Sequence, residues 1–576
     1  MKFSELSKYL ERLEKTPSRI EITKILAEVF SKTNSEETDL TTYLLLGSLA
    51  PSYKGVVFNI AERMMIDVLA KAYNSEKHKV MALYKKLGDL GDVATELAQT
   101  SNIKSRKFNL SVSQVYNQLL DLAKDEGEKS VERKIAKMAK LLADLDPLSA
   151  RYVARIPVGR LRLGFSDKTI LDSLSWMETG NKSKKAKLEK AYQVIPDVGL
   201  LAKRVKEFGI DKATKNIVPI VGIPVLPMLP QRIKSPTEMI EKMGKVFVEP
   251  KFDGLRVLIH YKKEKTKEQV MAFTRNLNNV VDMFSELKDV GKHVHARELI
   301  LDTEAIGMDP EVKRMVDFQT TMQRRRKYEI EMKAKEIPLR FQVFDIVYKD
   351  GESLMDLPYY ERREILKKVI KDDELLIVDD AVVAEDPKVI VSEYNEKIKA
   401  GLEGVVVKRY DTAYIPGRTG WRWVKMKQSE SELGKLADTV DCVVMGYTQG
   451  RGKRASFGVG QFLVGVRDGN DIKTVTKVGT GLTDEQFRIL KKRLKKIETK
   501  KRPKNYIVSK LLEPDYWVEP SLVVEIAADE ITKSPNHSAG LALRFPRLVR
   551  FRDDKDPRNA TTVEEVQKLF RMQKGF

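Results

Sequence analysis

A proline-rich segment divides this sequence into two regions of different hydrophobic periodicity. Residues 218–231, VPIVGIPVLPMLPQ, hold four prolines in an apolar setting, which suits an extended connector and opposes a helix. Before it, apolar residues recur at helical spacing, and in residues 135–145 they predict a helix that stops at Asp146-Pro147. After it, short β-branched and aromatic runs indicate strands with intervening helices. Such a chain must fold as more than one domain.

Length and composition agree with several domains in a reducing compartment. A chain of 576 residues is too long for one core, and roughly three to five domains are expected. Hydrophobic content of 42% and charged content of 32% are typical of a soluble globular protein. No run approaches about 18 apolar residues, so we expect no membrane span and no membrane partner. The single cysteine, Cys442, excludes internal disulfides and multi-cysteine zinc sites.

The net charge of +21 indicates a polyanionic partner, most often nucleic acid, although solubility and heat adaptation are alternatives. In the helical region, basic residues lie beside turns and helix starts. They are Arg151, Arg155, Arg160, Arg162, Lys168 and the lysine-rich run 181–190. Such residues can reach phosphates through side chains and backbone N–H groups, which favours a helical domain that grips duplex DNA. A solvated charged face is the alternative.

The stretch 245–260, KVFVEPKFDGLRVLIH, predicts a strand, a tight turn and a second strand. Lys251 precedes the turn, with Glu249 two residues before it and Arg256 five residues after it. A lysine beside a pocket wall with an arginine nearby has the groups that attack on a phosphate requires. The alternative is a solvated lysine in a surface hairpin.

Five further signals follow in the central region, each at or near the end of a predicted strand. They are Arg275 after VMAFT, Glu304 in ELILDTEAIG, Phe344 in LRFQVFDIVYKDG, Glu403 and Lys408 around GVVV, and Lys425 with Lys427 in WVKMK. Alone, each is an ordinary exposed charge or core aromatic. Together with Lys251 they supply a nucleophile, cations for phosphate, carboxylates for a metal and a ribose, and an aromatic for a base.

The C-terminal region shows short alternating strands with glycine turns, which predict a small β-barrel of the oligonucleotide-binding kind. Residues 561–573 predict a short amphipathic helix. We therefore predict a multidomain α+β protein. Residues 1–217 form an all-helical DNA-binding domain, residues 218–435 a domain of antiparallel sheets with helices, and residues 436–576 the barrel with its C-terminal helix.

The motifs EPKFDGLR, FTRN, LDTEAI, FDIVYKDG, EGVVVK and WVKMK resemble the ordered series of the covalent nucleotidyltransferases. With the helical N-terminal region and the segment RIPVGRLRLG, the chain resembles the ATP-dependent DNA ligases of archaeal and eukaryotic replicative type. The resemblance covers nearly the whole chain. One motif alone is weak, whereas six in order are specific.

The resemblance implies roles for individual residues. Lys251 would become covalently adenylylated, Glu249 would help to hold the adenine, and Phe344 would stack on it. The other implied contacts are those of Arg256 and Arg275 with ribose and phosphate, Glu304 with ribose or metal, Glu403 with metal, and Lys425 and Lys427 with the α-phosphate. In the last motif, LRFPRLVRFRDDK, the implied role of Arg552 and Lys555 is to orient the pyrophosphate.

Two positions depart from the family pattern. The arginine usually found six residues before the first lysine of WVKMK is Thr419 here, and the neighbouring Arg418 is expected to take over its contact. After FTRN, relatives tend to carry a glutamate where this chain has Asn278.

As a member of such a family, the chain would use ATP and Mg²⁺ to seal nicks in duplex DNA during replication, repair and recombination. We expect a monomer in the archaeal cytoplasm or in a nucleus, with a sliding clamp as a further candidate partner. RNA ligases and capping-type guanylyltransferases share the core motifs, and a non-catalytic nucleic-acid-binding protein would not need Lys251. An NAD-dependent ligase is disfavoured because one cysteine cannot build its zinc module.

Overall fold

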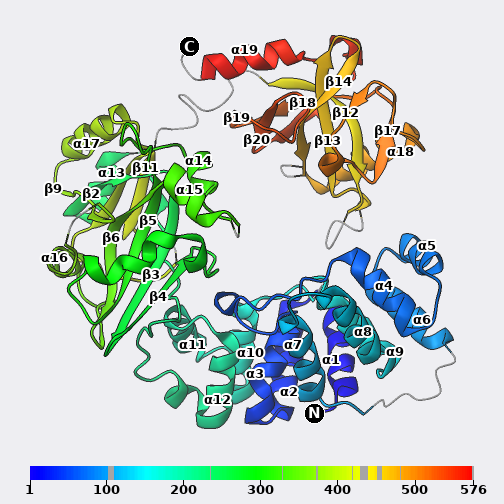
Figure 1. The fold of residues 1–576 in the computed structure, drawn as a ribbon, viewed down its shortest axis with the longest axis horizontal. Coiled ribbons are helices and arrows are strands. Elements are labelled where there is room, and N and C mark those ends of the chain that lie inside the picture. Colours follow the sequence, from blue (N-terminus) through cyan, green and yellow to red (C-terminus); the bar gives the residue numbers. More distant parts are fainter. Residues whose placement is uncertain are drawn as a thin grey trace. The chain divides into compact units, whose positions relative to one another are not determined.

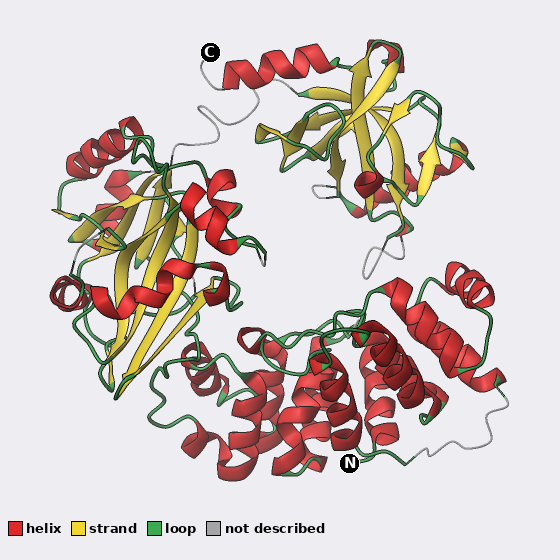
Figure 2. Ribbon diagram, in the orientation of Figure 1, coloured by secondary structure: helices red, strands yellow, loops and turns green. Residues whose placement is uncertain are grey.

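The structure, a computed structural model, describes residues 1–101, 109–161, 163–233, 235–326, 328–371, 374–417, 420–427, 439–450, 457–479 and 482–573. The chain forms two compact units, Met1–Lys427 and Gln428–Phe576. Helices make up the N-terminal part of the first unit, and sheets dominate its remainder and the second unit (Figure 2). Among the described helices, none combines the length and apolar character needed to cross a membrane.

The N-terminal region is helical (Figure 1). Its helices are α1 (Phe3–Lys15), α2 (Arg19–Lys32), α3 (Ser35–Leu45), α4 (Glu62–Ala72), α5 (Lys77–Leu87), α6 (Leu90–Thr100), α7 (Val112–Lys124), α8 (Ser130–Ala143), α9 (Pro147–Arg155), α10 (Asp167–Thr179), α11 (Lys185–Val194) and α12 (Val198–Ala213). The helix predicted over residues 135–145 is α8, and it ends at Ala143, just before the predicted stop at Asp146-Pro147. Asp146 Oδ1 accepts hydrogen bonds from Leu148 N and Ser149 N and so caps the start of α9.

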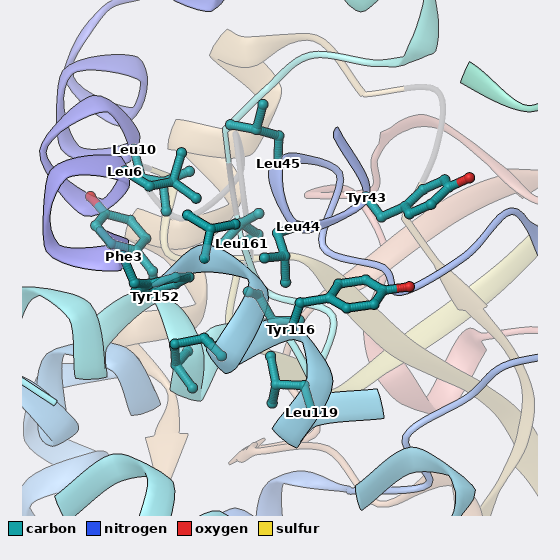
Figure 3. Close-up of a cluster of buried hydrophobic side chains, with 14 of the residues drawn as sticks. Phe3, Leu6, Leu10, Tyr43, Leu44, Leu45, Tyr116, Leu119, Tyr152 and Leu161 are labelled. Atoms are coloured by element: carbon teal, nitrogen blue, oxygen red, sulfur yellow. The ribbon is translucent and has the colours of Figure 1, made fainter. Parts of the chain in front are cut away.

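The core of this region combines aliphatic side chains with tyrosines such as Tyr43 and Tyr116 (Figure 3). Tyr43 donates a hydrogen bond of 2.6 Å to Asp197, and Tyr116 donates one of 2.5 Å to the carbonyl of Leu49. A buried hydroxyl without a partner would destabilise the fold, so these bonds permit tyrosines at positions that face the core.

The central region contains two sheets. The first has the order β1-β11-β10-β2-β9, with β1 (Gln231–Arg232), β2 (Val246–Lys251), β9 (Val382–Ala384), β10 (Gly404–Arg409) and β11 (Trp423–Lys427). The second has the order β4-β3-β5-β6-β7, with β8 paired to β6, and comprises β3 (Leu255–Glu264), β4 (Lys267–Thr274), β5 (Glu298–Gly307), β6 (Leu339–Lys349), β7 (Glu352–Ser353) and β8 (Leu376–Val378). The helices of this region are α13 (Pro236–Met243), α14 (Phe318–Met322), α15 (Ile330–Glu336), α16 (Tyr359–Val369) and α17 (Pro387–Lys399).

The second unit is rich in strands. Its strands are β12 (Val440–Thr448), β13 (Gln461–Asp468), β14 (Asp471–Val478), β15 (Glu498–Thr499), β16 (Tyr506–Ile507), β17 (Tyr516–Val518), β18 (Val523–Ala527), β19 (Glu530–Lys533), β20 (Leu541–Arg544) and β21 (Arg547–Phe551). Its helices are α18 (Asp484–Lys496) and α19 (Val563–Gln573), and α19 confirms the predicted C-terminal helix. The predicted order of helical, mixed and strand-rich parts is therefore confirmed.

Candidate functional site

A cavity of about 310 Å³ lies in the first unit and is walled by both sheets of the central region. The first sheet contributes residues of β2, β10 and β11, and the second contributes residues of β3, β5 and β6. The sequence-predicted residues that line it are Glu249, Lys251, Arg256, Arg275, Glu304, Phe344 and Lys425. Residues distant in sequence thus meet at one concave site, as a small-molecule pocket requires.

Cross-strand register in the first sheet arranges the charged side chains in rows. Because side chains two residues apart share a face, Glu249 and Lys251 of β2 lie on the same side. Gly404 of β10 pairs with Lys251 on one side and with Lys427 on the other. A residue without a side chain therefore separates the two lysines. Gly404 has φ of +143° and close backbone neighbours, so a larger residue would be strained there.

One carboxylate joins the two lysines at this end of the cavity. Glu403 Oε2 lies 2.5 Å from Lys251 Nζ, and Glu403 Oε1 lies 3.0 Å from Lys427 Nζ. Burial alone would raise the pKa of Glu403, but the two ammonium groups outweigh it and the pKa lies below its usual value. The sequence predicted Glu403 as a metal ligand and Lys427 as a phosphate contact, and the structure joins both side chains to Lys251 in one cluster.

The pKa of Glu304 is shifted in the opposite direction from that of Glu403. Glu304 lies opposite Arg256 in the β3–β5 ladder. Burial raises the pKa of Glu304 to about 7, although Lys251 and Arg256 oppose the rise. The cavity therefore holds two carboxyl groups whose environments push their pKa values in opposite directions, a property that is frequent at functional sites.

The guanidinium group of Arg256 is held by other residues of the first unit. Its Nε lies 2.9 Å from Asp302 Oδ1, its Nη2 lies 2.5 Å from Asp302 Oδ2, and its Nη1 donates to the carbonyl of Met228 at 2.6 Å. Its guanidinium carbon lies 5.3 Å from the centre of the Phe344 ring. Arg256 therefore fixes the connector and the aromatic wall, and Leu229 and Pro230 of the connector line the cavity.

The other end of the cavity holds a buried polar network around Glu249. Its Oε1 accepts hydrogen bonds from Tyr359 and from Arg363 Nη1, the latter at 2.9 Å. Its Oε2 lies 2.5 Å from Lys408 Nζ, and Lys408 Nζ lies 4.7 Å from the centre of the Phe344 ring. The Glu249 carboxylate is thus compensated before any ligand binds.

Sequence reasoning assigned no individual contact to several residues of the cavity wall. Lys408 belongs to a motif that was recognised, and Trp423 begins the strand that carries Lys425 and Lys427, so both had a sequence signal. Asp379 and Phe318 had none, because neither lies in a motif and only the fold brings them to the cavity.

The residues of the last motif lie in the second unit. Arg552 Nη1 lies 3.0 Å from both carboxylate oxygens of Asp441, and Lys555 Nζ lies 2.5 Å from Asp441 Oδ2. Arg552 also binds Asp554, whose pKa it lowers to about 2. Arg418, the expected replacement for the family arginine, lies outside the described residues.

In the helical region, the structure corrects one part of the phosphate-contact prediction. Arg155 is 1% exposed and is bound by Asp89, Glu14 and Asp92, so it cannot reach DNA. Within the run 181–190, Lys182 and Lys185 pair with Asp172, whereas Lys184 and Lys187 pair with Asp211. Arg162 lies outside the described residues.

The described residues contain no group of three or more metal-ligating side chains placed to hold an ion. This does not conflict with a magnesium site, because magnesium commonly binds through one or two carboxylates together with substrate phosphates. Glu403 and Glu304 are carboxylates of that kind, and both interact electrostatically with Lys251.

Family models match three parts of the chain. Residues 2–175 match the model described as DNA ligase N terminus, residues 227–427 match ATP dependent DNA ligase domain, and residues 455–555 match ATP dependent DNA ligase C terminal region.

Curated relatives match over the full length. A protein of Dictyoglomus thermophilum named "Probable DNA ligase" is 41% identical over 585 residues, covering 100% of this chain and 98% of the relative. "DNA ligase" of Saccharolobus solfataricus is 36% identical over 596 residues, covering 100% and 98%. A solved structure named "Pmar-Lig_Pre." covers 95% of this chain and 99% of its own at 18% identity, with a TM-score of 0.55, which supports the fold alone.

Proposed function

Because the chain belongs to the ATP-dependent DNA ligase family, we propose that it seals nicks in duplex DNA through a covalent intermediate on Lys251. It is a DNA ligase, ATP is its substrate, and nicked DNA is its partner. The observation that carries the proposal is the position of Lys251. This lysine lines the cavity, with Glu403 at 2.5 Å, and Lys425 also lines the cavity wall.

The first step is attack on ATP. Lys251 Nζ gives up a proton to water, and its lone pair attacks the α-phosphorus. The bond from that phosphorus to the bridging oxygen breaks, pyrophosphate leaves, and a phosphoramidate remains on Lys251. The AMP group then passes to the 5′-phosphate of a nick, and the 3′-hydroxyl displaces AMP to seal the strand. Lys425 and Lys427 hold the α-phosphate during the first step.

The remaining cavity residues position the nucleotide. Phe344 stacks on the adenine, and Glu249 shapes the pocket at that end through its bonds to Tyr359 and Lys408. Glu304 meets the ribose or the metal. Arg275, which follows β4 and is exposed at the cavity, contacts ribose or phosphate, whereas Arg256 acts through Phe344 and Asp302.

Glu403 and Glu304 fit a magnesium ion because both are carboxylates at the Lys251 end of the cavity. A bound magnesium ion would offset negative charge on the phosphate oxygens. Glu403 also holds Lys251 Nζ in an ion pair at 2.5 Å, so the carboxylate that would bind the ion fixes the position of the amine as well.

The three proposed domains, residues 1–217, 218–435 and 436–576, have different functions. The helical domain grips the DNA backbone, so binding weakens as salt rises. Arg552 and Lys555 orient the pyrophosphate, with Arg418 as a further phosphate contact. The protein acts as a monomer in replication, repair and recombination within the cell, and a sliding clamp is a further partner.

Incubation with radiolabelled ATP tests the proposal. Label should become bound to the protein in an acid-labile form, remain with Lys245→Ala and disappear with Lys251→Ala. Lys245 is the matched control because it is an exposed lysine directly before β2. Nicked DNA and nicked RNA are then compared as acceptors. Label retained by Lys251→Ala, or sealing of nicked RNA alone, would contradict the proposed function.

A further inference from the structure

One acidic residue of the cavity wall has no part in the function proposed above. Asp379 directly follows β8, lines the cavity and is 4% exposed. Its Oδ1 is buried and has no hydrogen-bond partner within the described part of the chain. A buried acceptor left unpaired destabilises a fold, so such an atom at a binding site suggests that a ligand completes it.

Its neighbours place Asp379 at the end of the cavity away from Lys251. Strand β8 runs parallel to β6, and Val378 of β8 pairs with Val343 of β6. The residues that follow this pair are Asp379 after β8 and Phe344 in β6. Adjacent strands lie about 4.8 Å apart, so the carboxyl group flanks the ring on which a base would stack. The backbone carbonyl of Asp379 also accepts a hydrogen bond from Arg363, which binds Glu249.

Glu249, the other acidic residue at this end, cannot easily serve as an acceptor. Its Oε1 already accepts hydrogen bonds from Tyr359 and Arg363, and its Oε2, although without a hydrogen bond among the described residues, lies 2.5 Å from the Lys408 ammonium group in an ion pair. Burial and the neighbouring Glu249 raise the pKa of Asp379 well above its usual value, while Lys408 and Arg363 oppose the rise. A carboxyl group keeps an acceptor oxygen in either protonation state, so the argument does not depend on its charge.

We propose that Asp379 is a specificity-determining residue whose Oδ1 accepts a hydrogen bond from the exocyclic amino group of the adenine, so that ATP is preferred over purine triphosphates lacking that group. The inference rests on the proposed function, since it assumes that ATP binds in this cavity with the base at the Phe344 end. A donor lies there as well: Trp423 is buried, lines the cavity, and its Nε1 has no hydrogen-bond partner among the described residues. The base end thus offers both an unpaired acceptor and an unpaired donor.

The test combines a change in the protein with a change in the nucleotide. Adenylylation kinetics are measured with ATP and with purine riboside triphosphate, which lacks the amino group, for the wild type, Asp379→Leu and Asp379→Asn. The wild type should prefer ATP about tenfold, mainly through KM, and Asp379→Leu should lose this preference. Asp379→Asn should retain it, because an amide oxygen is also an acceptor. If Asp379 had a purely structural role, its substitution would slow adenylylation equally with both nucleotides and would leave the preference for ATP unchanged.

Asp380→Leu is the matched control, since Asp380 is the exposed neighbour of Asp379, and its preference for ATP should equal that of the wild type. If the leucine variant does not fold, Asp379→Ala removes the same oxygens without added bulk. Equal use of both nucleotides by the wild type, or an unchanged preference in Asp379→Leu or Asp379→Ala, would overturn the inference alone. Absence of any nucleotide adduct on the wild type would overturn the proposed function together with it.

Discussion

The two clusters that the sequence connected with phosphate are built alike but have different tasks. In the cavity of the first unit, Glu403 is shared by Lys251 and Lys427; in the second unit, Asp441 is shared by Arg552 and Lys555. Each carboxylate occupies cations that a phosphate would otherwise bind. Only the cavity cluster contains a residue that must become a nucleophile, and only there does a second carboxyl group, Glu304, have a pKa raised to about 7. A carboxylate shared by two cations is therefore not enough to identify a site of nucleophilic attack.

The largest expected contrast comes from replacing one lysine by arginine in each cluster. Lys251→Arg keeps the positive charge beside Glu403, but a guanidinium does not lose its proton, so adenylylation should fall by at least about 10³-fold. Lys555→Arg also keeps the positive charge, and we propose that charge alone is enough for Lys555 to orient the pyrophosphate. The adenylylation rate should therefore fall by less than about tenfold. Single-turnover adenylylation measures both. Similar losses in the two variants would show that the clusters do not differ in this way.

The carboxylate of the cavity cluster gives the next effect. Glu403→Gln keeps the shape but removes the charge proposed to bind magnesium, so adenylylation should fall about 10²-fold and need at least tenfold more magnesium. Titration of the rate with magnesium provides the measurement. Glu396→Gln is the control, because Glu396 is an exposed glutamate that pairs with Lys397 at 2.8 Å. A variant with unchanged magnesium dependence would remove Glu403 from the metal site.

The raised pKa of Glu304 predicts a pH-dependent loss of stability. Its pKa of about 7 in the folded protein exceeds the ordinary 4.5, so the folded state holds more protons than the unfolded chain between these values. The free energy of unfolding should therefore decrease as pH rises through this window. Glu304→Gln should match the wild type near the low end and be more stable by about 1–3 kcal/mol above pH ~7. Urea unfolding across the window measures the difference, and parallel pH profiles would contradict it.

The smallest effect is expected at the cluster of the second unit, and it has the opposite sign to that of Glu403→Gln. Asp441→Asn weakens the hold on Arg552 and Lys555 and should raise the adenylylation rate about two- to fivefold at low salt. Added salt should reduce the gain, because it screens the ion pairs of the wild type. Asp553→Asn is the control, since Asp553 binds Arg493 instead. A fall in rate for Asp441→Asn would mean that Asp441 positions these cations usefully.

The sequence predicted the local elements of the site well. Lys251 ends β2, Arg275 follows β4, and Lys425 and Lys427 share a face of β11, because strand periodicity and turn residues are encoded over a few neighbouring residues.

The partners of these residues were not predictable. Asp302 for Arg256, Asp441 for Arg552 and Glu403 for Lys251 are set by tertiary contacts that leave no local signal. For Arg155, the sequence suggested a contact that the tertiary structure excludes. In sequence it is indistinguishable from a surface arginine, yet it is buried against three carboxylates. The buried, unpaired Oδ1 of Asp379 likewise emerges only from the fold.

Peptide mapping by mass spectrometry after exposure to ATP and magnesium tests the central claim most directly. The account predicts that a mass corresponding to AMP is found on the peptide that contains Lys251, and that nicked DNA removes it. An AMP adduct on a different residue, or nick sealing by protein that never carries an adduct, would contradict it.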